Sequence, residues 1–282
     1  MSDGMSEQSF EVKTPARLQV SNIRGLTEIR AGAAGVITIQ ARKIDGSGDL
    51  ERTEIQISQE SDGTVRVKTH FPETAMGWMS GNRPCKVEYR ISAPADCILK
   101  VNGVLNDTRL EGFDHQCSVN AVSGDLDLRQ LSGEVTAGVV SGNLKLESVS
   151  GTIKLNSVSG DISSERLSGS LDVSTVSGDV QVQQSALESI QANVTSGKVE
   201  AVTALGAGPY RFHSVSGDVR LRLPQETRCT AELHSISGGL QVKHLPQTAS
   251  QHRNGRQVAE IQGGGVMVYL NSVSGDLTLA AQ

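Results

Sequence analysis

The chain has 282 residues, a mass of 29.8 kDa and a formal net charge of −5 at pH 7. Acids and bases are interspersed, so no basic stripe indicates nucleic-acid binding and no polybasic patch indicates binding to an anionic membrane. Aromatic residues make up only 3% of the chain and glycines number 30, a balance typical of narrow coils filled with aliphatic side chains.

Residues 1–9 are polar, and we expect them to form a disordered tail. They lack the basic start and apolar run of a signal peptide, and the sequence contains no run of about 18 apolar residues that could cross a membrane as a helix. We therefore expect a cytoplasmic protein without direct membrane insertion, or a protein of the cell envelope if a leader has been removed.

Residues 10–95 carry the period-two alternation of strands, most clearly at 36–44, 53–60 and 64–70. Asp62-Gly63 predicts a hairpin turn between the last two. We expect an antiparallel region that caps the first edge of a stack of coils, because an open edge invites another strand to pair. The segment around Gly25 resembles a first, degenerate coil, and Trp78 is interpreted as a plug over an edge of the core.

Seven nonapeptides follow one another without insertion from Val122 to Gln184, each with one Ser-Gly pair. An aliphatic residue stands before every Ser, another stands three residues after it, and the positions between are mainly polar. This alternation predicts a short strand, and the glycine predicts a corner because it reaches positive φ without a clash. Since one unit is too small to be stable alone, the units must stack on one another.

Two nonapeptides make a coil of 18 residues, and later Ser-Gly pairs at 196, 216 and 237 keep spacings of 19 to 21. The predicted fold is therefore all-β: a single-stranded parallel β-helix (β-solenoid) over 96–282, right-handed by the usual crossover chirality, with an inserted loop or hairpin at 245–265 that leaves the body. We expect aliphatic residues to line up in register inside the core, notably Val122, Val140, Val158 and Val176.

Candidate metal sites are weak in this sequence. His213 and His234 lie one coil apart and could stack as ligands, but a third donor is missing, and both are also explained as residues of a second corner. The Ser-Gly corner has neither the paired glycines nor the obligatory acid of calcium-binding β-rolls. The cysteines, at 85, 97, 117 and 229, show no CxxC spacing and are interpreted as small buried residues. We predict no metal and no cofactor.

Catalytic chemistry is not indicated either. A polysaccharide-active β-helix enzyme needs clustered acids or bases on one outer face, whereas the outward positions here vary from copy to copy. No GxSxG motif is present. Because long insertions in repeat proteins often bind partners, His252, Arg253 and Arg256 in the insertion are the candidate interaction residues.

The recurring V-S-G-D-[LV]-x-[LV], together with VSNIRG, VITIQA, VRVKTHFP and KVEYRISAP, resembles a bacterial β-strand-repeat family of unknown function labelled "putative adhesin". The resemblance extends from about Phe10 to Ala280 and implies a β-solenoid, but the family supplies no catalytic residues to carry over. Bactofilins, cytoskeletal polymers of short coils, are similar in architecture alone.

The sequence thus predicts a non-catalytic β-solenoid scaffold that binds a protein or an envelope glycan, and no nucleic acid. One alternative is a self-assembling, bactofilin-like polymer, a homo-oligomer formed by end-to-end stacking, because the chain ends almost on a strand with no obvious sequence to cap its final coil. The other is a polysaccharide-active β-helix enzyme.

Overall fold

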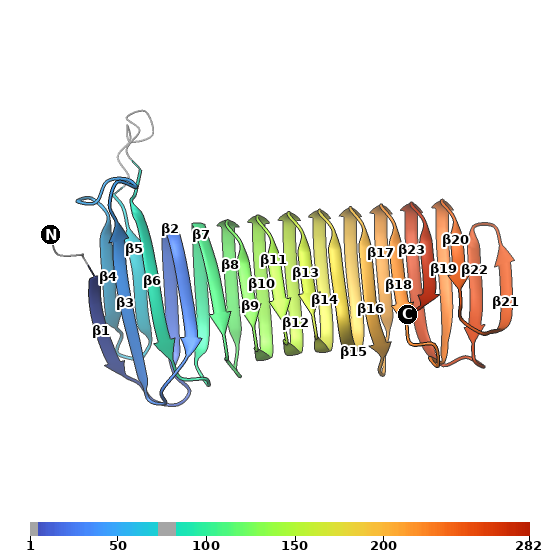
Figure 1. The fold of residues 1–282 in the computed structure, drawn as a ribbon, viewed down its shortest axis with the longest axis horizontal. Coiled ribbons are helices and arrows are strands. Elements are labelled where there is room, and N and C mark those ends of the chain that lie inside the picture. The colour runs from blue at the N-terminus through green and yellow to red at the C-terminus, as the bar shows by residue number, and fades with distance from the viewer. Residues whose placement is uncertain (1–4, 73–82) are drawn as a thin grey trace. The chain divides into compact units, whose positions relative to one another are not determined.

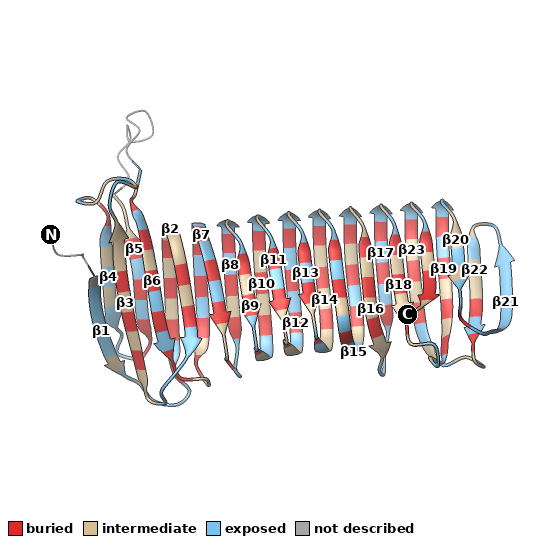
Figure 2. Cartoon of the chain, viewed as in Figure 1, coloured by how far each residue is buried: buried red, intermediate tan, exposed pale blue. Residues whose placement is uncertain are grey.

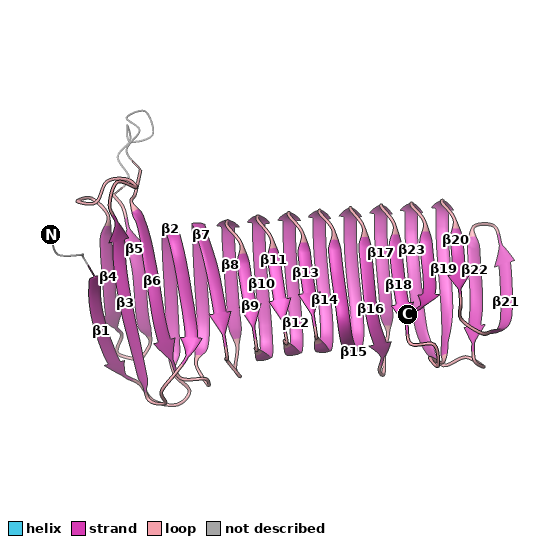
Figure 3. Cartoon of the chain, in the orientation of Figure 1, coloured by secondary structure: helices cyan, strands magenta, loops and turns pink. Residues whose placement is uncertain are grey.

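Strands are the only regular secondary structure in the computed structural model, which describes residues 5–72 and 83–282 (Figure 3). Trp78 and its predicted role as a plug lie outside these residues. The chain divides into two compact units, residues 1–142 and 143–282, which are described in turn. Within the described ranges, no helix is long and apolar enough to cross a membrane.

Unit 1 contains two sheets that share their two longest strands (Figure 1). Its strands are β1 (Met5–Glu11), β2 (Arg17–Ala31), β3 (Val36–Ile44), β4 (Glu54–Gln59), β5 (Val65–His70), β6 (Lys86–Ala93), β7 (Ile98–Glu111), β8 (Cys117–Ser123), β9 (Leu126–Arg129) and β10 (Ser132–Ser141). One sheet has the order β4-β5-β2-β7-β8-β10 and the other β1-β3-β6-β2-β7-β9. β2 and β7 therefore each contribute a strand to both sheets.

The start of unit 1 corrects two predicted boundaries. Met5–Glu11 pairs antiparallel with β3, so the disordered tail predicted for 1–9 is wrong for residues 5–9. β2 runs parallel to β7 from the pair Arg17 and Ile98 to the pair Arg30 and Glu111, so the parallel stack begins near residue 17 instead of residue 96. The alternating aliphatic residues of β2 bury one face against the core, which lets the segment act as a coil although it lacks a Ser-Gly pair.

Unit 2 again has two sheets that share one long strand, β15. Its strands are β11 (Leu144–Glu147), β12 (Ser150–Ser159), β13 (Ile162–Glu165), β14 (Ser168–Ser177), β15 (Val180–Ser196), β16 (Val199–Leu205), β17 (Tyr210–Ser216), β18 (Val219–Leu223), β19 (Cys229–Ser237), β20 (Leu240–Lys243), β21 (Gln247–Arg253), β22 (Arg256–Ile261), β23 (Val266–Ser274) and β24 (Leu277–Ala281). The orders are β12-β14-β15-β17-β23-β19-β22-β21 and β11-β13-β15-β16-β18-β24-β20.

The Ser-Gly corners stack on one another in register, as the repeat predicts. Ser159 pairs with Ser177, which pairs with Ser196. A Cβ on Gly178 would lie 2.3 Å from the carbonyl oxygen of Gly160, and Gly178 has a φ of +129°. The corner glycine is therefore required twice: by its backbone conformation and by the close approach of the neighbouring coil.

The residue before the Ser-Gly pair alternates between two environments, which corrects the prediction that all of these residues are buried. Figure 2 shows the bands of buried and exposed residues along the strands. In every second copy the aliphatic residue is exposed, by 51% at Val122, 47% at Val140, 48% at Val158 and 51% at Val176. In the copies between, it is buried: Leu131, Val149 and Leu167 are at most 1% exposed.

Strand phase explains this alternation. In β12, Ser157 occupies the last inward position, and its hydroxyl donates to the carbonyl oxygen of Gly160 at 3.4 Å, so Val158 must face outward. Before the other corner stands a non-glycine residue with positive φ, such as Ser148 or Arg166, both at 56°. This left-handed residue changes the phase of the chain, and the aliphatic residue after it turns inward.

The C-terminal strands do not form the last coil, which corrects the prediction of an uncapped end. β23 lies between β17 and β19, and β24 lies between β18 and β20. The insertion 245–265 does not leave the body either: β22 pairs antiparallel with β19 and buries Ala259 and Ile261 completely. The insertion forms a cap because its alternating residues extend the apolar face of β19 by one strand.

The cysteines are free and buried. Burial raises the pKa of the Cys97 and Cys117 thiols to about 12 and that of Cys229 to about 11. They act as small core residues, as predicted from their spacing.

Candidate interaction surfaces

The candidate residues of the insertion lie at the tip of the β21–β22 hairpin. Arg253 and Arg256 face each other across a two-residue turn in which Asn254 has a φ of 47° and Gly255 a φ of 73°. Positive φ at both central residues is typical of the type I′ turn that Asn-Gly favours. Since side chains alternate along a strand, Arg253 and Arg256 share one face and His252 lies on the other. The structure thus brings two of the three residues together.

The hairpin belongs to a basic stretch of an otherwise acidic chain. From Leu233 to Ala259 there is no acid, but there are six basic or imidazole residues: His234, Lys243, His244, His252, Arg253 and Arg256. Arg256 is held by an ion pair between its Nη2 and Glu232 Oε2 at 2.8 Å. All residues of β21 are exposed.

His213 and His234, which the sequence placed one coil apart, do not lie side by side. His213 and His234 each pair in register with Asn271 of β23, which lies between them. Two strand spacings, about 10 Å, separate their backbones. Both lie on strands, facing outward, and not at a corner. Among the described residues no group of three or more His, Cys, Asp or Glu side chains could hold a metal ion.

The exposed aliphatic residues of unit 2 form a row, here called the valine row: Val158, Val176, Val215, Val273 and Ile236, with Thr195 between the second and third. Each stands directly before a stacked Ser, so neighbours are about 4.8 Å apart and the row extends over about 24 Å. Exposure ranges from 47% at Val273 to 74% at Ile236. The alternation of the sequence alone does not separate these positions from the buried ones, because residues with positive φ, such as Ser148 and Arg166, reset the phase of the strand.

The acid that follows many Ser-Gly pairs has a structural role. The backbone N–H of Asp179 donates to Asp161 Oδ1 at 2.9 Å, and that of Lys198 donates to Asp179 Oδ1 at 2.8 Å. The same bond joins the Asp276 N–H to Asp218 and the Gly239 N–H to Asp276. In unit 1 the Asp125 N–H donates to Asp107. These side chains fasten one corner to the next.

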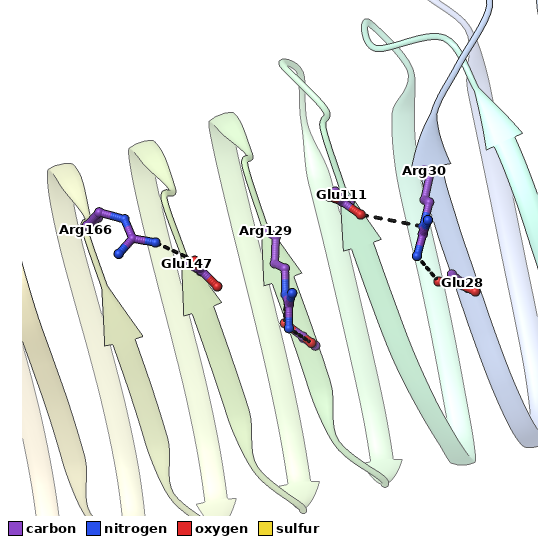
Figure 4. A network of polar contacts seen from close by, with 7 residues as sticks. Glu28, Arg30, Glu111, Arg129, Glu147 and Arg166 are labelled. Atoms are coloured by element: carbon purple, nitrogen blue, oxygen red, sulfur yellow. Dashed lines mark hydrogen bonds and ion pairs between the residues drawn. The ribbon is translucent and has the colours of Figure 1, made fainter.

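The second sheet of unit 1 has an outer face of alternating charges (Figure 4). Arg30 Nη2 lies 2.6 Å from Glu28 Oε1, and its Nε lies 3.6 Å from Glu111 Oε2. Arg129 pairs with Asp127 at 2.8 Å. A shallow hollow bordered by Glu28, Arg30 and Arg90 lies over β2, β3 and β6. Because each of these acids is paired with an arginine, this face has the character of a solvated, charge-balanced surface.

A polar cluster is buried between the first strands of unit 1. Asn22 Nδ2 donates to Asn106 Oδ1 at 2.7 Å, and Thr69 Oγ1 donates to Asn22 Oδ1 at 3.0 Å. The Tyr89 and Thr69 hydroxyls are 2.7 Å apart, and burial raises the pKa of Tyr89 to about 12. Because these groups satisfy one another across β2, β5, β6 and β7, the cluster fixes strand register and is closed to solvent.

Comparison with known proteins gives one family and several distant structures. A family model described as Toastrack DUF4097 matches residues 27–280. No curated protein matches the chain. A solved structure of a "putative adhesin" from Parabacteroides merdae is 13% identical, with 99% of this chain and 96% of that chain covered and a TM-score of 0.47.

Two proteins from Parabacteroides distasonis are similar to the same extent. A "putative lipid binding protein" is 9% identical over 100% of this chain and 98% of its own, with a TM-score of 0.49. A "putative adhesin" is 13% identical over the same shares, with a TM-score of 0.43. No functional conclusion about this chain follows from these likenesses.

Proposed function

The chain belongs to the Toastrack DUF4097 family, a family of unknown function, and on that premise we propose that it is a non-catalytic scaffold that binds a partner protein. In this proposal the body is a right-handed β-solenoid with coils of about 18 to 21 residues. Its stacked strands present the same side-chain position again and again, at the spacing of the strands.

The observation that carries the proposal is the valine row. Aliphatic side chains that stand side by side with about half of their surface in water are unusual in a sheet whose other outward positions are mainly polar. The row is bordered by exposed serines on one side and by Asn, Ser and His side chains on the other. An apolar centre with a polar rim is the anatomy of protein–protein interfaces.

A protein partner fits this surface better than a glycan does. Sugar rings stack on aromatic side chains, and aromatic residues make up 3% of the chain. Tyr269, on β23, has its ring covered by the Arg211 guanidinium, 5.6 Å from the ring centroid. The glycan is therefore an outcome to be tested and not the partner that we propose.

The test places a photo-crosslinking amino acid at Val215, in the valine row, and in a matched control at Gln181, an exposed residue of β15 in the other sheet. In cells of the source organism we expect protein crosslinks from Val215 alone. Competition by excess unlabelled protein should remove them, whereas competition by a Val176→Asp, Val273→Asp variant should not. Equal crosslinks from both positions, no crosslinks, or selective retention by isolated envelope glycan would contradict the proposal.

The enzymatic alternative has its own test. Incubation with a panel of acidic and neutral polysaccharides should leave each polymer at its original length, as judged by size-exclusion chromatography. Shortened chains that persist with freshly purified protein, and disappear in a variant of Glu28 and Glu111, would show that the protein is an enzyme.

A further inference from the structure

Each unit has one pair of strands that are paired on one side only within the described chain. In unit 1, β4 pairs with β5 and β1 pairs with β3. In unit 2, β21 pairs with β22 and β20 pairs with β24. Such strands offer backbone N–H and C=O groups to any further strand that can approach them.

The core is not fully covered at these strands. Ile55 and Ile57 on β4 are half-buried, and so are Leu240 and Val242 on β20. Aliphatic residues one strand further inside, such as Val65, Val67, Leu277 and Leu279, are fully buried. An added strand on each side would complete the burial of these four side chains.

The two pairs of edge strands carry opposite charge. The acidic edge of unit 1 comprises β1 and residues 45–62, with β4 among them. It has eight acids and one base, namely Glu7, Glu11, Asp45, Asp49, Glu51, Glu54, Glu60 and Asp62 against Arg52. Arg66 and Arg17 lie beside two of these acids, Glu60 at 3.0 Å and Asp62 at 4.0 Å. The other six form no ion pair with a basic residue within the part of the chain that the structure describes.

The basic edge of unit 2 comprises β20, β21 and the residues that connect them. Lys243 and Arg253 lie there with His244 and His252, and the whole stretch has no acid. Neither Lys243 nor Arg253 has an ion pair within the described residues. Charges on edge strands normally prevent pairing between copies, because like charges repel. Here that repulsion acts between two acidic edges or two basic edges, while an acidic and a basic edge attract.

We propose that the chain associates with a second copy of itself through these edges, the basic edge of one copy pairing with the acidic edge of the next. Backbone hydrogen bonds between edge strands of six and seven residues supply the contact, and the charges select its direction. Since the two surfaces differ, the contact is heterologous, and each copy keeps one edge free for another. This inference does not rest on the valine row.

The experiment uses two charge-reversal variants of the full chain. Lys243→Glu with Arg253→Glu makes the basic edge acidic. Glu7→Lys, Glu11→Lys, Glu51→Lys and Glu54→Lys together leave the acidic edge with four acids and five bases, which makes it basic. In light scattering at low salt, the mass of the unaltered protein should rise with concentration, and this association should weaken about tenfold or more at ~0.5 M salt. Each variant alone should stay monomeric, with an unchanged circular dichroism spectrum.

Mixing the two variants is the decisive arm, because every contact between unlike copies then joins opposite charges again. We expect association to return in the mixture. A monomer at all concentrations for the unaltered protein, association that survives either reversal, or a mixture that stays monomeric would overturn the inference. Association that is lost on Val176→Asp but not on the reversals would also overturn it, and would leave the proposed protein-binding role standing.

Discussion

The aliphatic residues before the Ser-Gly pairs show that residue type does not by itself determine burial. Val176 and Leu167 both precede a Ser-Gly pair, nine residues apart, yet one is exposed and the other buried. Thr175, itself 4% exposed, already fills the inward position beside Val176. Before Leu167, Arg166 has positive φ and turns the chain inward.

This difference predicts unequal costs for the same truncation. Leu167→Ala should lower the free energy of unfolding by about 2 to 5 kcal/mol, because it leaves a cavity in the core. Val176→Ala should cost only about 0.5 kcal/mol, as expected of a surface position. Urea denaturation of both variants measures the difference, and equal costs would show that the two copies share one environment.

The corner glycines allow a second comparison at single residues. Gly178→Ala should cost about 3 kcal/mol or more, since the Cβ would meet a backbone carbonyl and the φ of +129° is strained for alanine. Gly263→Ala is the matched control, because its φ is +82° but only the end of Arg228 lies within 4 Å. We expect that variant to cost about 1 kcal/mol in the same urea titration.

At the scale of the element, the corner is held by side chains as well as by backbone. The Asp side chain after Ser-Gly accepts the N–H of the next coil, and Asn143 does the same for the Asp161 N–H at 3.1 Å. The acid in V-S-G-D is therefore explained by its acceptor oxygen and not by its charge.

Variants of Asp179 test this explanation. Asp179→Ala should lower the free energy of unfolding by about 1 kcal/mol, because the Lys198 N–H loses its acceptor. Asp179→Asn should be close to neutral, since the amide oxygen can take the same place. Thermal denaturation of both variants gives the answer, and an equal loss in the two would point to charge.

The hairpin β21–β22 was predicted to leave the body, but the structure shows it packed against β19 as a cap. Deleting residues 247–261 would uncover β19 and remove the buried side chains of Ala259 and Ile261 that pair with it. We expect a lower melting temperature and concentration-dependent aggregation. A shortened hairpin that keeps β22 but lacks β21 is the control and should melt like the full chain; an unchanged melting temperature after the full deletion would mean that the hairpin does not cap unit 2.

At the scale of each folded unit, chain order and spatial order differ in unit 2. Val268, Leu270, Leu277 and Leu279 are completely buried because β23 and β24 have neighbours on both sides. The last strands of the chain are thus interior strands.

Removing residues 266–282 should therefore disrupt more than one coil. We expect amide hydrogen exchange to become fast in β17, β18, β19 and β20, which all lose a neighbouring strand. Exchange in β12 and β13 should stay slow and serves as the internal control. Fast exchange confined to one neighbour would indicate an ordinary terminal coil.

The sequence by itself determined the repeating unit of this protein. Alternation over a few residues specifies a strand, and Ser-Gly specifies a corner, because both depend on local sterics; the parallel register of unit 2 follows from repeating them at a constant period.

Tertiary structure decided what local patterns leave open. Which copy of the repeat turns its aliphatic residue inward depends on the phase across a corner, set by residues such as Ser148 and Arg166. The partners of β2 and β23 are the strands whose apolar faces would otherwise be left open. Those strands lie far away in the chain, so a local pattern cannot identify them.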